Sequence, residues 1–213
     1  MKPSDTEIKK EQALQDSLAR VKKGLAPLSD SVNAAKVTAK VTTLDSADLK
    51  LPFGAAKVGT EKIITLENDT IVAKISSKGG RVKSVQLKGD HNFNGQPLML
   101  FDGDHNKFGL KFNADGKNIN TNDLYFATEA TDVKITGQDS KSVKLQLNYS
   151  ADKYIEYVYT LKGSGYNVGL DINTKGIQNS IDQKLITLDW ETILLQKEQN
   201  IESERQKSTI YYK

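Results

Sequence analysis

Residues 63–88 constrain the fold more than any other part of this sequence, because they place three short β-type runs back to back. Residues 67–69 separate the first run from the second, and residues 76–80 separate the second from the third. In the third run, apolar residues alternate with polar ones, with one slip, at Val82, Val85 and Leu87. Such alternation is typical of a half-buried strand, and the pair Gly79-Gly80 supplies the positive φ of a tight turn. The segment predicts an antiparallel sheet.

Beyond residue 60 the chain continues as short β-type runs with turn signals about every 8–12 residues, the spacing of a sandwich of antiparallel sheets. Strands are expected at residues 63–66, 71–76, 81–87, 97–101, 108–113, 125–126, 132–136, 142–149, 154–161, 167–173, 184–195 and 209–212. A charged helix or loop is expected at residues 196–207. Residues 60–213 therefore form the predicted all-β domain.

The first 59 residues have a different character. Leucine and valine recur with helical spacing within residues 6–23, which predicts a short amphipathic helix. Residues 26–59 contain few large apolar side chains, so they bury too little surface to offset the entropy of ordering and are interpreted as a flexible linker. The domain boundary is expected near Gly59 and Thr60.

Composition excludes several classes of function. The 30 basic and 27 acidic residues are interspersed and leave a net charge of +3, which argues against a nucleic-acid surface. With no cysteine, thiol catalysis, disulfides and thiolate metal sites are excluded. No apolar run approaches the about 18 residues of a membrane helix, so this polypeptide is expected to be soluble.

Two polar segments were weighed as metal sites. Asp102, Asp104 and Asn106 offer oxygen ligands at alternate positions, but an EF-hand loop would need glycine in place of Lys107 and glutamate in place of Asn113. A polar turn is the favoured interpretation. The two histidines, His91 and His105, lie in turn-rich stretches without the three or four ligands of a zinc site, so both are expected at the surface.

The remaining candidates also have simpler explanations. The glycine-rich residues 163–169 lack dinucleotide-binding spacing and are expected to form a hairpin turn. The aromatic residues Tyr154, Tyr157, Tyr159 and Trp190 would suit a sugar-binding cleft, but cross-strand packing is favoured. Asn68 and Asn148 begin glycosylation acceptor patterns, which matter only in a secreted eukaryotic protein. No catalytic, cofactor-binding or metal-binding residue is predicted, and no enzyme activity is expected.

Several segments, taken together, resemble one protein family. They are ITLENDTIVAKISSKGGRVKSVQLK (64–88), GQPLMLFDGDHNKFGLKF (95–112), INTNDLYF (119–126), YIEYVYTLKGSGYNV (154–168) and LDWETILLQKEQNIESERQKSTIYYK (188–213). In this order they are similar to the large periplasmic domain of the membrane protein insertase YidC, in its Bacteroidota form. The most specific pieces are SSKGGRVKSVQLK, PLMLFDGD and ERQKSTIYYK.

The resemblance implies a β-supersandwich related to galactose mutarotase, on the periplasmic side of the bacterial inner membrane. It implies a non-catalytic docking domain of an insertase whose partners are Sec translocon subunits and nascent membrane proteins. It also implies a missing membrane helix before residue 1 and a domain that is incomplete at its C-terminal end. The alternative left open is a carbohydrate-binding β-sandwich module or a mutarotase-like protein, which rests on analogy of fold alone.

Overall fold

The computed structural model describes Leu49 and residues 51–207. The helix expected at residues 6–23, the linker up to residue 48 and the strand expected at residues 209–212 lie outside the described residues. In the described part nearly all regular structure is β-strand, arranged in three sheets. The all-β, sandwich-like class expected from the sequence is therefore confirmed.

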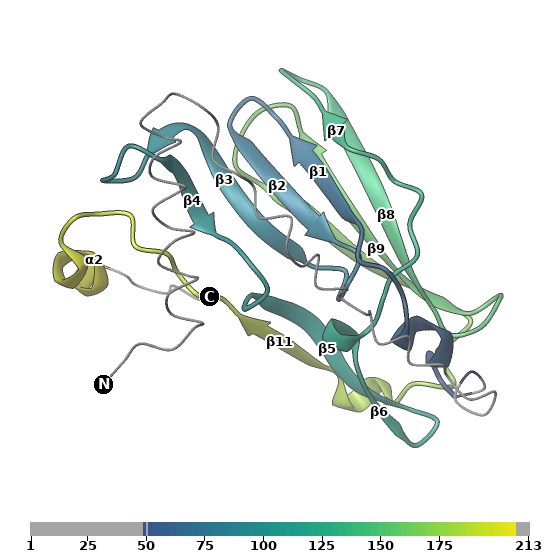
Figure 1. Ribbon diagram of the computed structural model, residues 1–213. Helices are drawn as coiled ribbons and strands as arrows, with labels where there is room; N and C mark the ends of the chain where they lie inside the picture. The colour runs from purple at the N-terminus through teal and green to yellow at the C-terminus, as the bar shows by residue number, and fades with distance from the viewer. Residues whose placement is uncertain (1–48, 50, 208–213) are drawn as a thin grey trace, which may run out of the picture. The chain divides into compact units, whose positions relative to one another are not determined.

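The largest sheet has five strands in the order β4-β3-β2-β1-β7 (Figure 1). Its members are β1 (Ile63–Glu67), β2 (Ile71–Ser76), β3 (Val82–His91), β4 (Pro97–Phe101) and β7 (Val133–Lys134). The first four strands are joined by hairpins and pair antiparallel, as predicted. Strand β7 instead runs parallel to β1, with Leu66 opposite Val133. The pairing is not wholly antiparallel, because the chain reaches this edge by a long crossover and not through a hairpin.

The slip in the alternation of β3 is a bulge. Lys74 of β2 pairs with Ser84, whereas the next residue, Ile75, pairs with Val82, so Lys83 is an extra residue in β3. An extra residue changes which side chains face the interior. As a result Ser84 is buried, whereas Val82 is only half-buried.

The turn between β2 and β3 has the geometry that the glycine pair predicted. Gly79 and Gly80 have φ angles of 78° and 63°, in the left-handed region that favours glycine. The amide of Ser76 donates to the carbonyl of Arg81 over 2.8 Å and closes the turn. A Cβ atom at Gly80 would lie 2.9 Å from the ring of Phe126, so this position also lacks space for a side chain.

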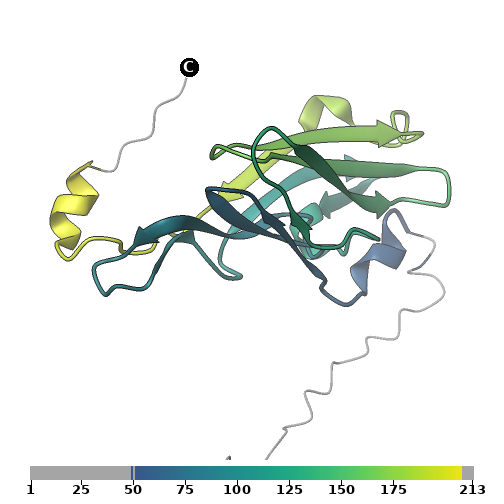
Figure 2. The ribbon, with the colours of Figure 1, turned by 90° about the horizontal axis from the view of Figure 1, so that it is seen from above.

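The two remaining sheets have three strands each. One has the order β10-β9-β8, with β8 (Ser140–Asn148), β9 (Tyr154–Lys162) and β10 (Val168–Lys175). The other has the order β11-β5-β6, with β5 (Lys107–Ala114), β6 (Lys117–Asn120) and β11 (Thr187–Glu191). Four short helices complete the described elements: η2 (Gly54–Lys57), η3 (Thr121–Asp123), η4 (Gln183–Leu185) and α2 (Ile201–Lys207). Figure 2 shows the green strands β8–β10 and the blue strands of the first sheet as separate layers.

The core lies where the inward faces of these sheets meet. Every second residue of β1, β2, β8 and β9 is buried: Ile64, Leu66, Ile71, Ala73, Ile75, Val143, Leu145, Leu147, Ile155, Tyr157, Tyr159 and Leu161. The Tyr159 hydroxyl donates to the carbonyl of Gly80 over 2.6 Å, which ties β9 to the β2–β3 turn. The rings of Phe126 and Tyr157 pack with centroids 4.8 Å apart. Tyr157 and Tyr159 are therefore packing residues of the core.

Besides the parallel pairing of β7, the structure differs from the sequence interpretation in four places. Strand β6 was not expected; a turn in which Asp115 and Gly116 have positive φ angles joins it to β5. The long strand expected at residues 184–195 is reduced to β11, and residues 125–126 contribute only an isolated bridge between Tyr125 and Lys78. Residues 51–57, assigned to the linker, bring Phe53 into the core, where it packs at 5.9 Å from Phe112 and 5.4 Å from Tyr149. One large aromatic residue supplies enough apolar surface to hold this segment against the domain.

Candidate functional site

An apolar pocket lies between the edge strands of the two smaller sheets. It has a volume of about 190 Å³. Strands from all three sheets contribute to its wall, which consists of Val82, Phe101, Asn106, Lys107, Phe108, Tyr159, Val168, Leu170, Trp190 and Thr192. We call this pocket, together with the exposed inner faces of β10 and β11 beside it, the edge groove.

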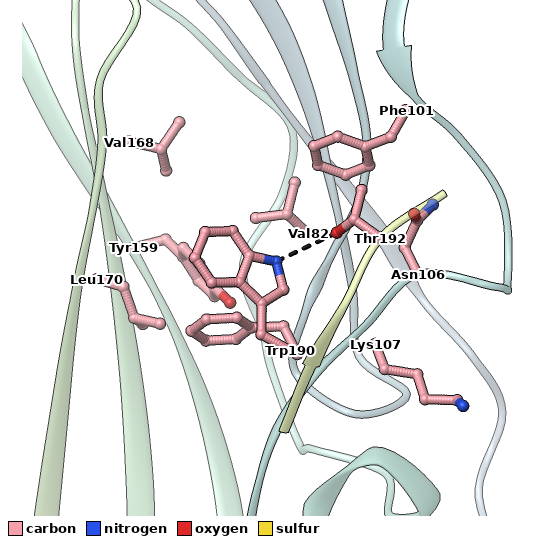
Figure 3. A pocket seen from close by; sticks show the side chains of 10 residues that line it. Val82, Phe101, Asn106, Lys107, Tyr159, Val168, Leu170, Trp190 and Thr192 are labelled. Atoms are coloured by element: carbon pink, nitrogen blue, oxygen red, sulfur yellow. Dashed lines mark hydrogen bonds between the residues drawn. The ribbon is translucent and has the colours of Figure 1, made fainter. Parts of the chain in front are cut away.

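Trp190 stands at the mouth of the edge groove. Its side chain is 72% exposed, an unusual state for the only tryptophan of the chain. The indole packs edge-to-face on Phe108, with centroids 5.9 Å apart, and its Nε1 donates to the Thr192 hydroxyl over 3.2 Å. Figure 3 shows the indole between Leu170 and Val168 on one side and Phe101 on the other. The ring is therefore held in place while one face stays open to water.

The strands that flank the groove are both sheet edges. Among the described residues, β10 pairs only with β9, and β11 pairs only with β5. Their groove sides carry exposed apolar side chains, with Ile172 39% and Leu188 51% exposed. A free strand edge offers unpaired amide and carbonyl groups, and the apolar residues beside it offer side-chain contacts. Unpaired backbone groups beside exposed apolar side chains are the features with which a sheet edge can bind an extended polypeptide.

The polar groups of the groove are already engaged. Asn106 donates to the carbonyl of Gly103 and accepts from the amide of Ile193, each over 3.1 Å. Lys107 pairs with Glu191 at 2.6 Å. Burial raises the pKa of Tyr159, and its hydroxyl is occupied by the carbonyl of Gly80. These groups hold the wall of the groove together, and none is placed as a general acid, base or nucleophile.

Comparison with known protein families matches residues 63–212 to the YidC periplasmic domain. That match covers more than half of the chain and includes every strand described above. The chain belongs to the YidC periplasmic domain family. This membership assigns it to the periplasmic side of the inner membrane.

Individual relatives agree with the family assignment. A protein of Parabacteroides distasonis named "Membrane protein insertase YidC" is 34% identical over 205 residues, which are 95% of this chain and 30% of the relative. Proteins of the same name from Chlorobaculum tepidum and Phocaeicola vulgatus are 37% identical over 158 residues and 29% identical over 215 residues. These alignments cover 72% and 100% of this chain, but only 27% and 33% of the relatives. The chain thus spans about a third of the length of the YidC proteins it matches. Among its described residues, no helix is long and apolar enough to cross a membrane.

The acidic segment at Asp102, Asp104 and Asn106 is the polar turn between β4 and β5, as predicted. The Asp104 carboxylate lies 2.8 Å from Lys83 Nζ and 3.4 Å from Arg81 Nη2, so protein cations hold it. His91 ends β3, His105 lies in the turn, and both are exposed, as predicted. Within the described residues, no three histidine or carboxylate side chains gather as a metal site would require.

The other candidate residues from the sequence lie at different places in the fold and do not form one site. Residues 163–167 form the β9–β10 hairpin turn, as predicted. Tyr157 is buried in the core and Tyr154 is half-buried. Tyr159 lines the same pocket as Trp190 but is 2% exposed, so the tyrosines do not form an exposed aromatic platform with Trp190. Asn68 is 1% exposed, because its amide donates to the carbonyls of Lys162 and Gly165. Its burial leaves no room for a glycan in the folded domain.

The edge groove itself was not predicted. Its signal in the sequence is the second apolar alternation after the β9–β10 turn, at Val168, Leu170 and Ile172, followed by Leu188 and Trp190. Such alternation indicates one apolar face but does not tell whether another layer covers it. Only the packing of the three sheets shows that this face lies open.

Proposed function

We propose that this chain is a non-catalytic scaffold and docking domain of a membrane protein insertase. In this role it supports the insertion and folding of inner-membrane proteins, alone or beside the Sec translocon. The observation that carries the proposal is the match of residues 63–212 to the YidC periplasmic domain, together with relatives whose printed name is "Membrane protein insertase YidC".

The chemistry of the domain supports a role in binding. The pocket of the edge groove is apolar, and its polar wall groups Asn106, Lys107 and Tyr159 are used within the fold. A sugar-binding or mutarotase-like function is not favoured, because Tyr157 is buried in the core and both histidines lie outside the groove. Tyr159 shares the pocket wall with Trp190, but it is 2% exposed and its hydroxyl donates to the carbonyl of Gly80. Mutarotation requires a general acid and base placed around the sugar ring.

A chimera tests the docking role. The region of the Parabacteroides distasonis relative that aligns with this chain would be replaced by the chain itself, and the chimera would be the sole copy in cells. A photo-crosslinking amino acid would be placed at one exposed position of each of three strands, Lys74, Lys144 and Leu188. We expect ultraviolet-dependent adducts with translocon subunits or with membrane proteins during insertion, and no adducts without irradiation. A functional chimera that gives no such adduct at any position would overturn the docking role.

Calorimetry tests the absence of sugar binding. Titration of the purified chain with a panel of hexoses and oligosaccharides is expected to release no saturable heat. Saturable heat with any of these sugars, abolished by Trp190→Ala, would replace the proposal with a carbohydrate-binding module.

A further inference from the structure

Three large apolar side chains form an exposed row along β11. Ile186, Leu188 and Trp190 are 47%, 51% and 72% exposed. Because they occupy every second position, they project on the same side of the strand. Ile186 precedes β11 directly and has extended backbone angles, with φ of −97° and ψ of 120°, so it continues the direction of the strand. A contiguous apolar patch of this kind on a protein surface commonly marks an interaction site.

The same residues direct their backbone groups to the open edge of the strand. In the neighbouring strand β5, the amides of Phe108 and Leu110 donate to side-chain oxygens of η3 over 3.2 and 2.9 Å. Helix η3 follows β6, which lies on the side of β5 away from β11. Since backbone groups alternate between the two sides of a strand, the odd-numbered residues of β5 and β11 bond to each other. The amide and carbonyl groups of Leu188 and Trp190 therefore point to the edge, which no other strand of the described residues pairs with.

A second copy of β11 offers the matching set of groups. Two such strands that pair antiparallel about a two-fold axis at Leu188 place this residue opposite its own counterpart and Ile186 opposite Trp190. Each of the three resulting residue pairs exchanges two backbone hydrogen bonds, because all three residues direct their groups to the edge. On the groove side the apolar row of one copy meets the apolar row of the other. A two-fold interface requires this kind of self-complementary surface.

The acidic residues of β11 select this register over its neighbours. With the axis at Leu188, Asp189 lies opposite Thr187 of the other copy, and Glu191 lies opposite Leu185. An axis at Asp189 would place two copies of this carboxylate directly opposite each other, and an axis at Trp190 would place Asp189 opposite Glu191. Like charges at directly opposite positions destabilise a strand pair. The register centred on Leu188 avoids both conflicts.

The size of the contact predicts a weak complex. The three side chains of the row expose roughly 300 Å² of apolar surface in each copy, so a pair would cover about 600 Å² in addition to the backbone edges. Stable interfaces bury about 1,200–2,000 Å², whereas transient complexes fall below this range. The expected association is therefore reversible and depends on concentration.

We propose that two copies of this chain associate by antiparallel pairing of their β11 edges about Leu188. The pairing joins the sheets β11-β5-β6 of both copies into one continuous sheet and covers Trp190. This inference goes beyond the proposed insertase role and does not depend on it, because it concerns only how copies of the chain bind each other.

Sedimentation equilibrium of the purified full chain tests the association. Between about 1 and about 300 µM, we expect the average mass to rise from that of one chain toward that of two. Leu188→Lys places two ammonium groups opposite each other and should weaken the association at least about tenfold. Val58→Lys, which alters a side chain of 43% exposure outside the groove, is the matched control and should associate like the unaltered chain. The mass of a single chain at all concentrations, or undiminished association of Leu188→Lys, would overturn the proposal.

Cysteine crosslinking tests the register, because the chain contains no cysteine and each introduced thiol is the only one. In the proposed pair the two Cα atoms at position 188 lie about 5.5 Å apart, a distance that a disulfide can span. Leu188→Cys should therefore give a covalent dimer with oxidised glutathione. Glu191→Cys is the control, since its counterpart lies six residues away along the strands, about 20 Å, and it should stay monomeric. Stronger crosslinking of Asp189→Cys than of Leu188→Cys, or equal crosslinking of Glu191→Cys, would contradict the proposed pairing.

Discussion

Strands β9 and β10 form one hairpin and present the same kind of alternation to the same side of their sheet, but their environments differ. The inward residues of β9 are buried by the first sheet and by Phe126, whereas those of β10 lie one strand farther out, beside the edge groove. Tyr157 and Ile172 are direct neighbours in register, with 0% and 39% exposure. Burial in this domain thus depends on the layer opposite a residue more than on the residue itself. Four comparisons between enclosed and exposed positions test this view.

The largest effect is expected for leucines on the two sides of this boundary. Leu145→Ala in β8 removes a side chain that is 0% exposed and leaves a cavity, so the free energy of unfolding should fall by about 3 kcal/mol. Leu188→Ala removes the same atoms at 51% exposure and should cost about 0.5 kcal/mol. Urea denaturation checks both values. Equal losses would mean that β11 is as well covered as β8.

A smaller loss is expected from two asparagines in turns. The Oδ1 atom of Asn68 accepts from the amides of Thr70 and Ile71, while its Nδ2 bonds to the β9–β10 hairpin. Asn68→Ala should cost about 2–3 kcal/mol, because several buried groups lose their partner. Asn92→Ala, in an exposed turn where Oδ1 accepts only from Asn94 and Gln96, should cost about 0.5–1 kcal/mol. Thermal unfolding of both variants measures the contrast, and a larger loss for Asn92→Ala would contradict it.

A comparison of two glycines with similar φ angles distinguishes the cost of backbone strain from the cost of steric crowding. Gly80 and Gly95 have φ angles of 63° and 73°, so alanine at either position costs about 1 kcal/mol of backbone strain. A Cβ atom at Gly80 would also meet the Phe126 ring at 2.9 Å, whereas at Gly95 nothing lies within 4 Å. We expect Gly80→Ala to lower the free energy of unfolding by about 1–2 kcal/mol more than Gly95→Ala. Identical urea midpoints for the two variants would show that the Phe126 ring moves aside freely.

The smallest effect is expected for the pH dependence of stability, through the ion pairs of Lys83 with Glu61 and Asp104. Burial opposes the charge of Glu61, but hydrogen bonds from Ser76 and Lys83 hold the pKa of its carboxyl below the ordinary value of 4.5. The hydrogen bond and charge of Lys83 hold the pKa of Asp104 below its ordinary 3.8. Both pKa values are lowered in the folded state, so their stabilisation is present above the ordinary values and is lost as pH falls through the folded-state values.

The unaltered chain should lose free energy of unfolding as pH falls from about 5 to about 3, and Lys83→Met should make that loss smaller. The difference should be less than about 1 kcal/mol, because Asp104 is largely exposed and its charge is screened by solvent. Lys107→Met, which breaks an exposed pair with Glu191, serves as the matched control and should leave the acid profile unchanged. Urea midpoints measured across this pH range decide the matter. An acid profile for Lys83→Met that follows the unaltered chain would show that the cluster does not couple to folding.

Much of the fold was predictable, because local rules govern it. The positive φ of Gly79 and Gly80, the turn at Asp115 and Gly116, and the alternation in β8 and β9 all follow from residue type and spacing. The bulge at Lys83 was visible only as a slip, since a one-residue insertion gains meaning from the partner strand. Phe53 was misassigned to a linker for a similar reason: a single aromatic residue in a polar stretch carries no period, and its burial depends on Phe112 and Tyr149 from distant strands.

The edge groove marks the limit of what the sequence determines. By itself the sequence determined the all-β class, the positions of most strands along the chain and the family resemblance. It also determined the apolar alternation at Val168, Leu170, Leu188 and Trp190. Only the tertiary structure decided that β10 and β11 are edges among the described residues and that their apolar faces share one opening. The physical reason is that alternation is set within a strand, whereas burial is set by the neighbouring strands and the opposite layer.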